Sequence, residues 1–253
     1  MAKQTRMGLP VPPAAIEFRP EFLDFDRGIR VGNLEDNERI TRILKLALEH
    51  RYQEPFVTER WGRGVFWQWI GYLPRSNRTA KPLSSAVSFG CAKFFITVDT
   101  EDRLFKCGMQ VERGYIQAPH DFSACELRED WDWHRLVRQL RKGSQLEREL
   151  KRLVVREGFG LHAGNWEEEI VEVSGDSLPG AAKLRRILET ARGDRWAGFQ
   201  LFYAFSEEEV RMTSGVDLVD SMLAVFGEVA PAMNLCMQIQ LTPALESSKS
   251  SST

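Results

Sequence analysis

The 253-residue chain lacks the short motifs from which an enzyme class can be read directly. It contains no glycine-rich phosphate loop, no GxGxxG turn that opens a helix after a strand, no HExxH pair and no GxSxG elbow. These absences exclude P-loop nucleotide hydrolases, Rossmann dinucleotide-binding domains, HExxH metalloproteases and α/β-hydrolases. Other enzyme classes stay open, because many active sites are assembled from residues far apart in the chain.

Cysteine is scarce as well. Its four residues, Cys91, Cys107, Cys125 and Cys236, lie far apart and form no CxxC pair, which argues against a zinc ribbon or a redox motif. Cys91 and Cys107 fall in apolar, strand-like runs, so we interpret them as buried free thiols. Unpaired thiols are typical of a reducing compartment, and the sequence therefore predicts a cytoplasmic protein.

Long apolar runs and an excess of charge of one sign are also missing. No stretch approaches the roughly 20 apolar residues of a membrane helix. The basic N-terminus has no apolar segment that would make it a secretory signal. The net charge of −2 argues against a dedicated duplex-binding module, which is usually basic. We therefore expect a soluble protein with no membrane partner, while a local basic patch for nucleic acid or another anion stays open.

The composition, by contrast, is that of a folding chain. Hydrophobic residues make up 43% of it and include seven Trp and fifteen Phe, which a disordered chain would lack. We expect residues 16–243 to form a single α+β domain. The Pro-rich residues 1–15 are predicted to be flexible, and the Ser-rich residues 244–253 to be a disordered tail.

Strand patterns recur along the chain. They predict an antiparallel sheet built from residues 64–73, 86–98, 103–112 and 197–205. The most regular pattern is a hairpin closed by a polar turn at residues 99–102. Its return strand alternates between an apolar face and a face that we expect to be solvated, the latter formed by Lys106, Gly108, Gln110 and Glu112. Residues 167–173 are a further short strand pattern, and residues 74–85 are predicted to be a loop.

Helical periodicity marks the remaining segments. It predicts helices at residues 33–50, 131–142, 145–157 and 179–192, and a long last helix whose apolar stripe runs from Val219 to Met233. Asn33 or Asp36 is expected to cap the first helix, and Ser206 a short acidic one. Pro231 predicts a kink or break in the last helix. Without a regular alternation of strands and helices, the order indicates an α+β fold with helices packed mainly on one face of the sheet.

The most unusual local feature is a set of basic and aromatic residues around the predicted sheet. Its members are Arg60, Trp61, Arg63, Arg75, Arg78, Lys81, Lys106, Gln110 and Arg113. If the sheet gathers them, they form a cationic surface with aromatic walls that suits a phosphate, a carboxylate or a single-stranded nucleic acid. The alternative is that they are solvated loop cations with no shared role.

Histidines and carboxylates give weaker signals. His120 and Asp121 are adjacent, but an exposed loop explains them better than a metal or a general base. Asp99 and Asp102 lie near Glu112 on the predicted hairpin, as in nucleases that hold a divalent metal there. The lysine that such a site needs is absent, and aspartates favour turns for a local reason, since they bond their own backbone.

Several segments resemble a family of bacterial conserved hypothetical proteins, a domain of unknown function of about two hundred residues. The similar segments are residues 75–82 (RSNRTAKP), 93–99, 105–109, 184–209 and 230–234, about a third of the chain. The chain departs from the family at Ala80 and Leu83, and it lacks the family's Asn-rich N-terminal segment. The resemblance implies one compact α+β domain and draws attention to Arg75, Arg78 and Pro82. It implies no activity.

Two functional hypotheses follow. The first is a binding or interaction protein that uses the basic and aromatic surface of the sheet for an anionic ligand or a protein partner. The second is an enzyme that acts on an anionic or phosphorylated substrate, with Glu112 as acid or base and Arg75, Arg78 and Arg113 as anion clamps. The sequence predicts no cofactor and no metal site. Its seven tryptophans leave open an aromatic homodimer interface.

Overall fold

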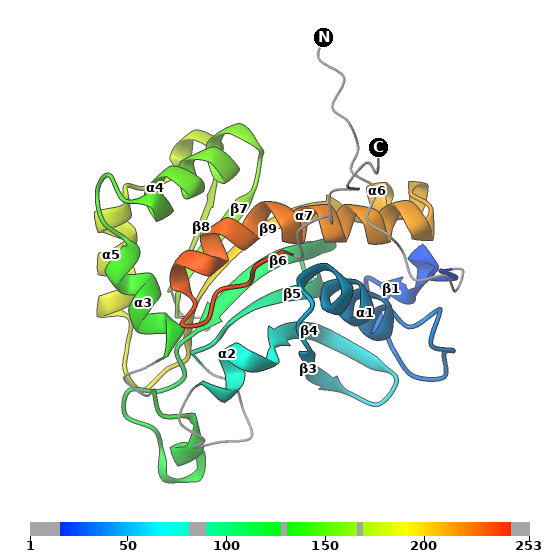
Figure 1. Cartoon of the computed structure of the whole chain (residues 1–253), viewed down its shortest axis with the longest axis horizontal. Coiled ribbons are helices and arrows are strands. Elements are labelled where there is room, and N and C mark those ends of the chain that lie inside the picture. The colour runs from blue at the N-terminus through cyan, green and yellow to red at the C-terminus, as the bar shows by residue number, and fades with distance from the viewer. Residues whose placement is uncertain (1–15, 81–89, 128–130, 166–168, 244–253) are drawn as a thin grey trace, which may run out of the picture.

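The computed structural model describes residues 16–80, 90–127, 131–165 and 169–243 (Figure 1). The predictions for residues 1–15 and 244–253 lie outside these ranges. Nine strands form one antiparallel sheet in the order β1-β2-β4-β5-β6-β9-β7-β8, with β3 paired to β4. The strands are β1 (Leu23–Asp24), β2 (Gly28–Arg30), β3 (Phe56–Arg63), β4 (Phe66–Pro74), β5 (Ala92–Asp99), β6 (Leu104–Glu112), β7 (Gly160–Asn165), β8 (Glu169–Ser174) and β9 (Ala197–Ser206).

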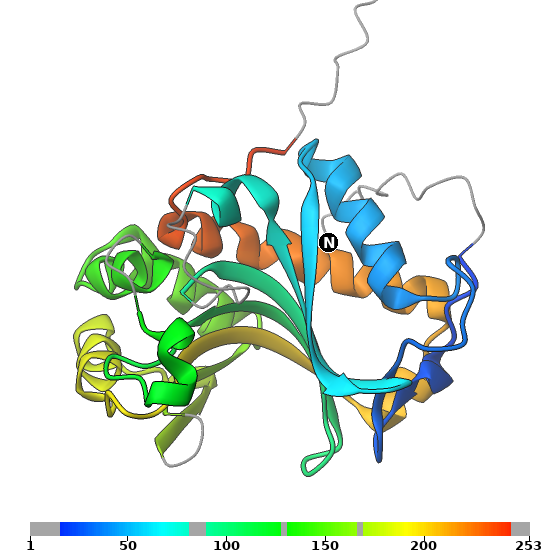
Figure 2. The same ribbon diagram turned by 90° about the horizontal axis from the view of Figure 1, so that it is seen from below.

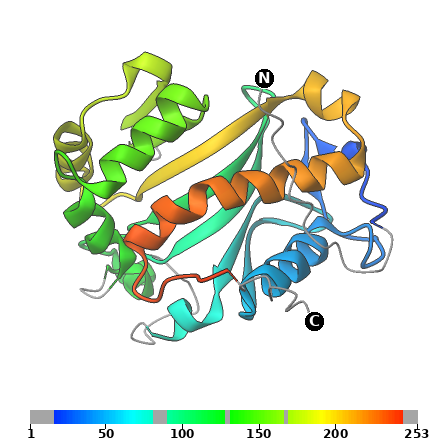
Figure 3. The same ribbon diagram turned by 45° about the horizontal axis from the view of Figure 1, so that its top comes forward.

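Two long helices cover one face of this sheet. Figures 2 and 3 show α7 crossing the strands, with α1 beside it on the same side. The α-helices are α1 (Ile40–Tyr52), α2 (Arg75–Thr79), α3 (Asp132–Gln139), α4 (Gln145–Leu150), α5 (Ala181–Thr190), α6 (Glu207–Met212) and α7 (Gly215–Cys236). Shorter helical turns are η1 (Pro20–Phe22), η2 (His120–Cys125), η3 (Lys151–Arg156, of the π type) and η4 (Gly175–Ser177). The α+β class predicted from the sequence is confirmed.

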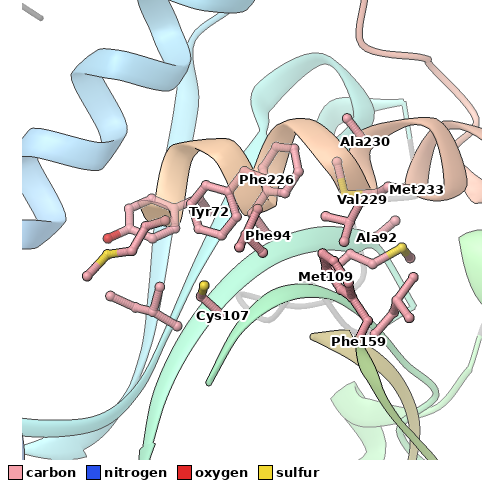
Figure 4. Packing of buried hydrophobic residues seen from close by; sticks show 14 of the residues in the cluster. Tyr72, Ala92, Phe94, Cys107, Met109, Phe159, Phe226, Val229, Ala230 and Met233 are labelled. Atoms are coloured by element: carbon pink, nitrogen blue, oxygen red, sulfur yellow. The ribbon is translucent and has the colours of Figure 1, made fainter. Parts of the chain in front are cut away.

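The hydrophobic core lies between the sheet and α7. Phe226, Val229 and Met233 of α7 point toward the strands (Figure 4). Phe226 stacks on Phe94 of β5, with ring centroids 4.8 Å apart. Apolar residues at alternate positions of the central strands thus meet the apolar stripe of the helix, and burial of this surface is the main force that holds the two layers together.

The predicted antiparallel hairpin and its turn are confirmed, although its first strand, predicted over residues 86–98, is β5 from Ala92 to Asp99, and residues 86–89 lie outside the described ranges. Strands β5 and β6 pair from Ala92 opposite Val111 to Asp99 opposite Leu104. The Asp99 Oδ1 atom accepts hydrogen bonds from the backbone N–H groups of Glu101 and Asp102, at 3.1 Å each, which explains the aspartate at this turn. Cys91 and Cys107 are buried free thiols, as expected, and burial raises the pKa of Cys107 well above that of an ordinary thiol.

Several predicted boundaries are wrong. The first helix begins at Ile40 rather than near Asn33, and neither Asn33 nor Asp36 caps it. Residues 74–85, predicted to be a loop, contain α2. Alpha-helix α7 continues through Pro231 without a break. Pro231 is exposed, so the carbonyl group that loses its hydrogen bond, one turn earlier on the same side, can be hydrated.

The strands that the sequence patterns did not predict are β1, β2, β3 and β7. The α6 cap, on the other hand, is confirmed: Ser206 and Glu209 form a reciprocal capping box. Among the described residues, no helix is long and apolar enough to cross a membrane.

Candidate functional site

Strand β3 divides the predicted basic and aromatic set between two faces of the sheet. Arg60 is paired with Ile70, whose side chain lies in the core, so Arg60 and Thr58 lie on the same face as α1. Trp61 is paired with Trp69 on the opposite face. Two neighbours in the sequence that we expected to form one surface therefore belong to two surfaces.

On the helix side, a cationic groove runs between α1 and the β3–β4 hairpin. It has a volume of about 360 Å³ and is lined by Arg39, Thr41, Arg42, Lys45, Thr58, Arg60 and Trp67. The Arg60 guanidinium lies over the Trp67 ring, with its Cζ atom 4.3 Å from the ring centroid. This stacking holds the cation at the wall of the groove and gives the site an aromatic side.

The carboxylates around the cationic groove neutralise only part of its charge. Asp36 is 3.2 Å from the Nη1 atom of Arg39 and 3.8 Å from the Nε atom of Arg42, and Glu49 is 3.7 Å from the Nζ atom of Lys45. No carboxylate lines the groove itself. Across the described ranges, no carboxylate forms an ion pair with Arg60. Four cations against two neighbouring carboxylates leave the groove positive.

The opposite surface, here called the polar face, is built around a buried lysine. Lys93 of β5 is 1% exposed, and its Nζ atom lies 2.9 Å from Glu59 Oε2 and 3.1 Å from Glu112 Oε2. Burial disfavours the charged ammonium, but the two carboxylates outweigh burial and raise the pKa of Lys93 above its usual value. Lys93 is therefore a fixed cation at neutral pH, not a nucleophile.

A second network extends the polar face across the central strands. The Gln110 Oε1 atom accepts hydrogen bonds from Trp69 Nε1, at 3.0 Å, and from Gln200 Nε2, at 2.6 Å. The Lys93 Nζ atom lies 5.5 Å from the centroid of the Trp69 ring, which joins this network to the ion pairs. Six residues, Glu59, Trp69, Lys93, Gln110, Glu112 and Gln200, thus connect strands β3, β4, β5, β6 and β9.

The prediction that this face of the hairpin is solvated is wrong. The alternation is as expected, but Lys106 is 3% exposed and Gln110 is 2% exposed. Lys106 is bound by Asp99, at 2.8 Å, and lies near Asp102, at 3.7 Å. Polar side chains can be buried here because their hydrogen-bonding groups and charges are matched by neighbours on adjacent strands.

Arg113 is held by backbone carbonyl groups and does not face an open surface. Its guanidinium is buried and donates hydrogen bonds to the carbonyl oxygens of Ala191, at 2.9 Å, Arg195, at 3.0 Å, and Arg192. These bonds tie the end of β6 to the loop before β9. Arg113 therefore cannot act as the anion clamp of the enzyme hypothesis without releasing that loop.

The other predicted cations are dispersed. Arg63 is exposed at the tip of the β3–β4 hairpin. Arg75 is exposed and Arg78 half-buried on α2, which follows the far end of β4. None of these three lines the cationic groove. Lys81 lies outside the described residues.

The structure also gives the positions of the two weaker site candidates, the hairpin carboxylates and the His120–Asp121 pair. Asp99 is paired with Leu104 at one end of the hairpin, whereas Glu112 is at the other end of β6, eight residues further along. At about 3.3 Å per residue, this separation is far too long for a shared metal, so the nuclease-like grouping is wrong. His120 and Asp121 are exposed, as expected, but they begin the short helical turn η2 and do not lie in a loop. Within the described ranges, no three His, Cys, Asp or Glu side chains gather into a metal-binding group.

Sequence reasoning missed the residues that matter most in both surfaces. Arg39, Arg42 and Lys45 recur at every third position, a signal that they share one side of a helix. Their partner strand β3 was not recognised, because its charged residues hide the alternation, so the cationic groove could not be foreseen. Glu59 was missed for the same reason, and its contact with Lys93 of β5 depends on the pairing of both β3 and β5 with β4.

Comparison with known proteins assigns no relative. The chain matches no protein-family model, and neither the curated proteins nor the solved structures contain a match to it. The resemblance to the bacterial domain of unknown function therefore stays a prediction.

Proposed function

We propose that the protein is a binding protein for a small anionic ligand, and that the ligand occupies the cationic groove between α1 and the β3–β4 hairpin. The observation that carries this proposal is the lining: four cations, two threonine hydroxyls and one tryptophan, without a carboxylate. The proposal keeps the basic and aromatic character predicted from the sequence and moves it to the helix side of β3.

The groove suits a phosphate or carboxylate group for two reasons. Guanidinium groups present several N–H donors in a planar fork that matches such anions, and Thr41 and Thr58 add hydroxyl donors. Arg60 is already oriented by Trp67, so less rotamer entropy is lost when an anion binds it. A volume of about 360 Å³ lies within the range of small-molecule sites.

The enzyme hypothesis has less support. Its proposed acid or base, Glu112, lies on the polar face and binds Lys93. Its clamp Arg113 is held by backbone carbonyl groups, and the cationic groove opens on the other side of the sheet. The groove lining has no carboxylate, histidine or cysteine that could transfer a proton or attack a substrate.

The test is calorimetric titration with inorganic pyrophosphate at low ionic strength. Wild-type protein is expected to bind it, and the double variant R42A/R60A to bind at least about tenfold more weakly, because two direct charge contacts are lost. The matched control is R141A/K142A, which removes the same charge from two exposed residues outside the groove.

Two results would contradict the proposal. One is a wild-type protein that gives no binding heat. The other is equal weakening in the groove variant and the control, which would mean that only net charge matters. A variant with R75A and R78A separates the alternatives further: if it alone weakens binding, the site lies at α2, where the sequence predicted it.

A further inference from the structure

The polar face carries a second set of groups that point to a ligand of different chemistry. Trp61 is 75% exposed, which is unusual for a tryptophan in a strand. It is paired with Trp69, and Trp69 donates its indole N–H to Gln110. An exposed aromatic ring therefore lies beside a hydrogen-bonding network whose central residues, Lys93 and Gln110, are buried.

The carboxylates of Glu59 and Glu112 beside Trp61 are held in place by Lys93, but each uses only one of its two acceptor oxygens in that contact. Lys93 binds one oxygen of Glu59 and one oxygen of Glu112. The Oε1 atoms of these two residues accept no hydrogen bond from the described part of the chain. Each carboxylate thus keeps an acceptor whose direction is fixed by the shared lysine, and both carboxylate side chains are partly exposed.

These features select the ligand by exclusion. An anion would meet two carboxylates, whose negative charge outweighs the single Lys93. A cation would find the position between the two carboxylates already occupied by the Lys93 ammonium. A purely apolar ligand would cover the carboxylate oxygens without hydrogen-bonding them, which costs roughly 1–3 kcal/mol for each buried group.

A neutral ligand with several hydroxyl groups meets every requirement. Its O–H groups can donate to the open carboxylate oxygens of Glu59 and Glu112, and the apolar side of its ring can lie on Trp61, whose ring is rigid and loses little conformational entropy. The amide of Gln200, half-buried beside Gln110, adds a further polar contact. We propose that the polar face of the sheet binds a neutral sugar through Trp61, Glu59 and Glu112.

This site is separate from the cationic groove. Arg60 and Trp61 are adjacent in β3 but lie on opposite faces, so a ligand on one side cannot touch the lining of the other. The two proposals can therefore fail independently.

The experiment uses an array of neutral mono- and oligosaccharides, with sulfated and sialylated glycans on the same surface as the anionic arm. Full-length wild-type protein is expected to retain neutral glycans. W61A is expected to lose about tenfold or more in affinity, because the stacking surface is removed. W61F should recover part of the binding, since it restores an aromatic ring. E59Q should also weaken binding, because its amide offers a poorer acceptor.

Two controls keep the result specific. M212A truncates another exposed apolar residue, on α6, and should bind as the wild type does. R42A/R60A should also retain neutral glycans, although it loses pyrophosphate. Thermal unfolding of E59Q identifies any loss that comes from weaker folding rather than from recognition.

Three outcomes would overturn the inference. The first is wild-type protein that retains no neutral glycan. The second is W61A that binds as well as the wild type. The third is retention of sulfated or sialylated glycans alone with loss in R42A/R60A, which would assign all binding to the cationic groove and leave the proposed function standing.

Discussion

The two faces of strand β5 reach the same degree of burial by different means. Phe94 points to α7 and stacks on Phe226, whereas Lys93, the preceding residue, points to the polar face and binds two carboxylates. Phe94 is completely buried and Lys93 is 1% exposed. On one side, burial removes apolar surface from water. On the other, every buried charge or polar group depends on a partner from another strand.

This difference decides how each face responds to change. The helix-covered face loses packing in proportion to the volume removed, because its contacts are numerous and non-directional. On the polar face, burial of each charged or polar group is tolerated only while its partner remains, so the loss of one member leaves another buried and unpaired. The substitutions below are chosen to separate the two behaviours, beginning with the largest expected effect.

Truncation of the core should have the largest effect. F94A removes a ring that packs on Phe226, Tyr52 and Phe56, and it should lower the free energy of unfolding by about 3–5 kcal/mol. The measurement is urea unfolding followed by fluorescence. A loss below about 1 kcal/mol would mean that the site can collapse around the cavity and that this face is not close-packed.

Removal of the buried cation should come next. K93M keeps most of the volume of the side chain but leaves Glu59 and Glu112 side by side without their partner, and we expect a loss of about 3 kcal/mol. The informative control is the triple variant K93M/E59Q/E112Q, which has no net charge at the site. It should recover much of the loss, since the cost comes from the unpaired carboxylates. Equal losses of stability in the single and triple variants would contradict the view that the cost comes from unpaired carboxylates.

Alkaline pH should reveal a smaller effect on the helix-covered face. The Tyr72 hydroxyl is buried against the backbone carbonyl of Ile40, and burial raises its pKa well above 10.0. Above pH 10.0, the pKa of Tyr72 in the unfolded chain, the unfolded chain releases the phenolic proton and the folded chain retains it, so stability falls as pH rises. The contribution of this hydroxyl group to stability is therefore complete only below pH 10.0.

The matched variant is Y72F. It should change stability at neutral pH by less than about 1 kcal/mol, because the hydrogen bond to Ile40 is long, at 3.4 Å. Between about pH 9 and 11 its stability should fall less steeply than that of the wild type. Lys93 also has a raised pKa and contributes a loss of the same sign, so the slope should shrink without vanishing. Parallel slopes would mean that Tyr72 ionises in the folded protein as readily as in the unfolded chain.

Much of the fold could be predicted from the sequence where one side of an element is apolar. Residues 103–112 alternate regularly and match β6, and the stripe from Val219 to Met233 matches α7. Strand β3 reads FVTERWGR, in which charged residues occupy both faces, so no period emerges. Its strand character comes from tertiary pairing with β4, which a local pattern cannot report.

The candidate site was less accessible to sequence reasoning. Alternation predicts the side of the sheet on which Lys106 and Gln110 lie, but it says nothing of whether that side is wet. Burial of the polar face depends on long-range partners such as Glu59 with Lys93 and Trp69 with Gln110. Likewise, Arg60 and Trp61 were grouped by proximity in the chain, although adjacent residues of a strand face opposite ways.

The smallest expected change in stability is at Trp61, and that makes it the sharpest test of the polar face. Because its side chain is largely in solvent, W61A should alter the free energy of unfolding by no more than about 0.5 kcal/mol. Paired with F94A, it compares two aromatic residues of one sheet that differ in exposure. A loss of about 2 kcal/mol or more would show that Trp61 covers part of the buried network and is structural. If W61A is as stable as the wild type but fails to bind neutral glycans, the exposed ring of Trp61 serves ligand binding and not stability.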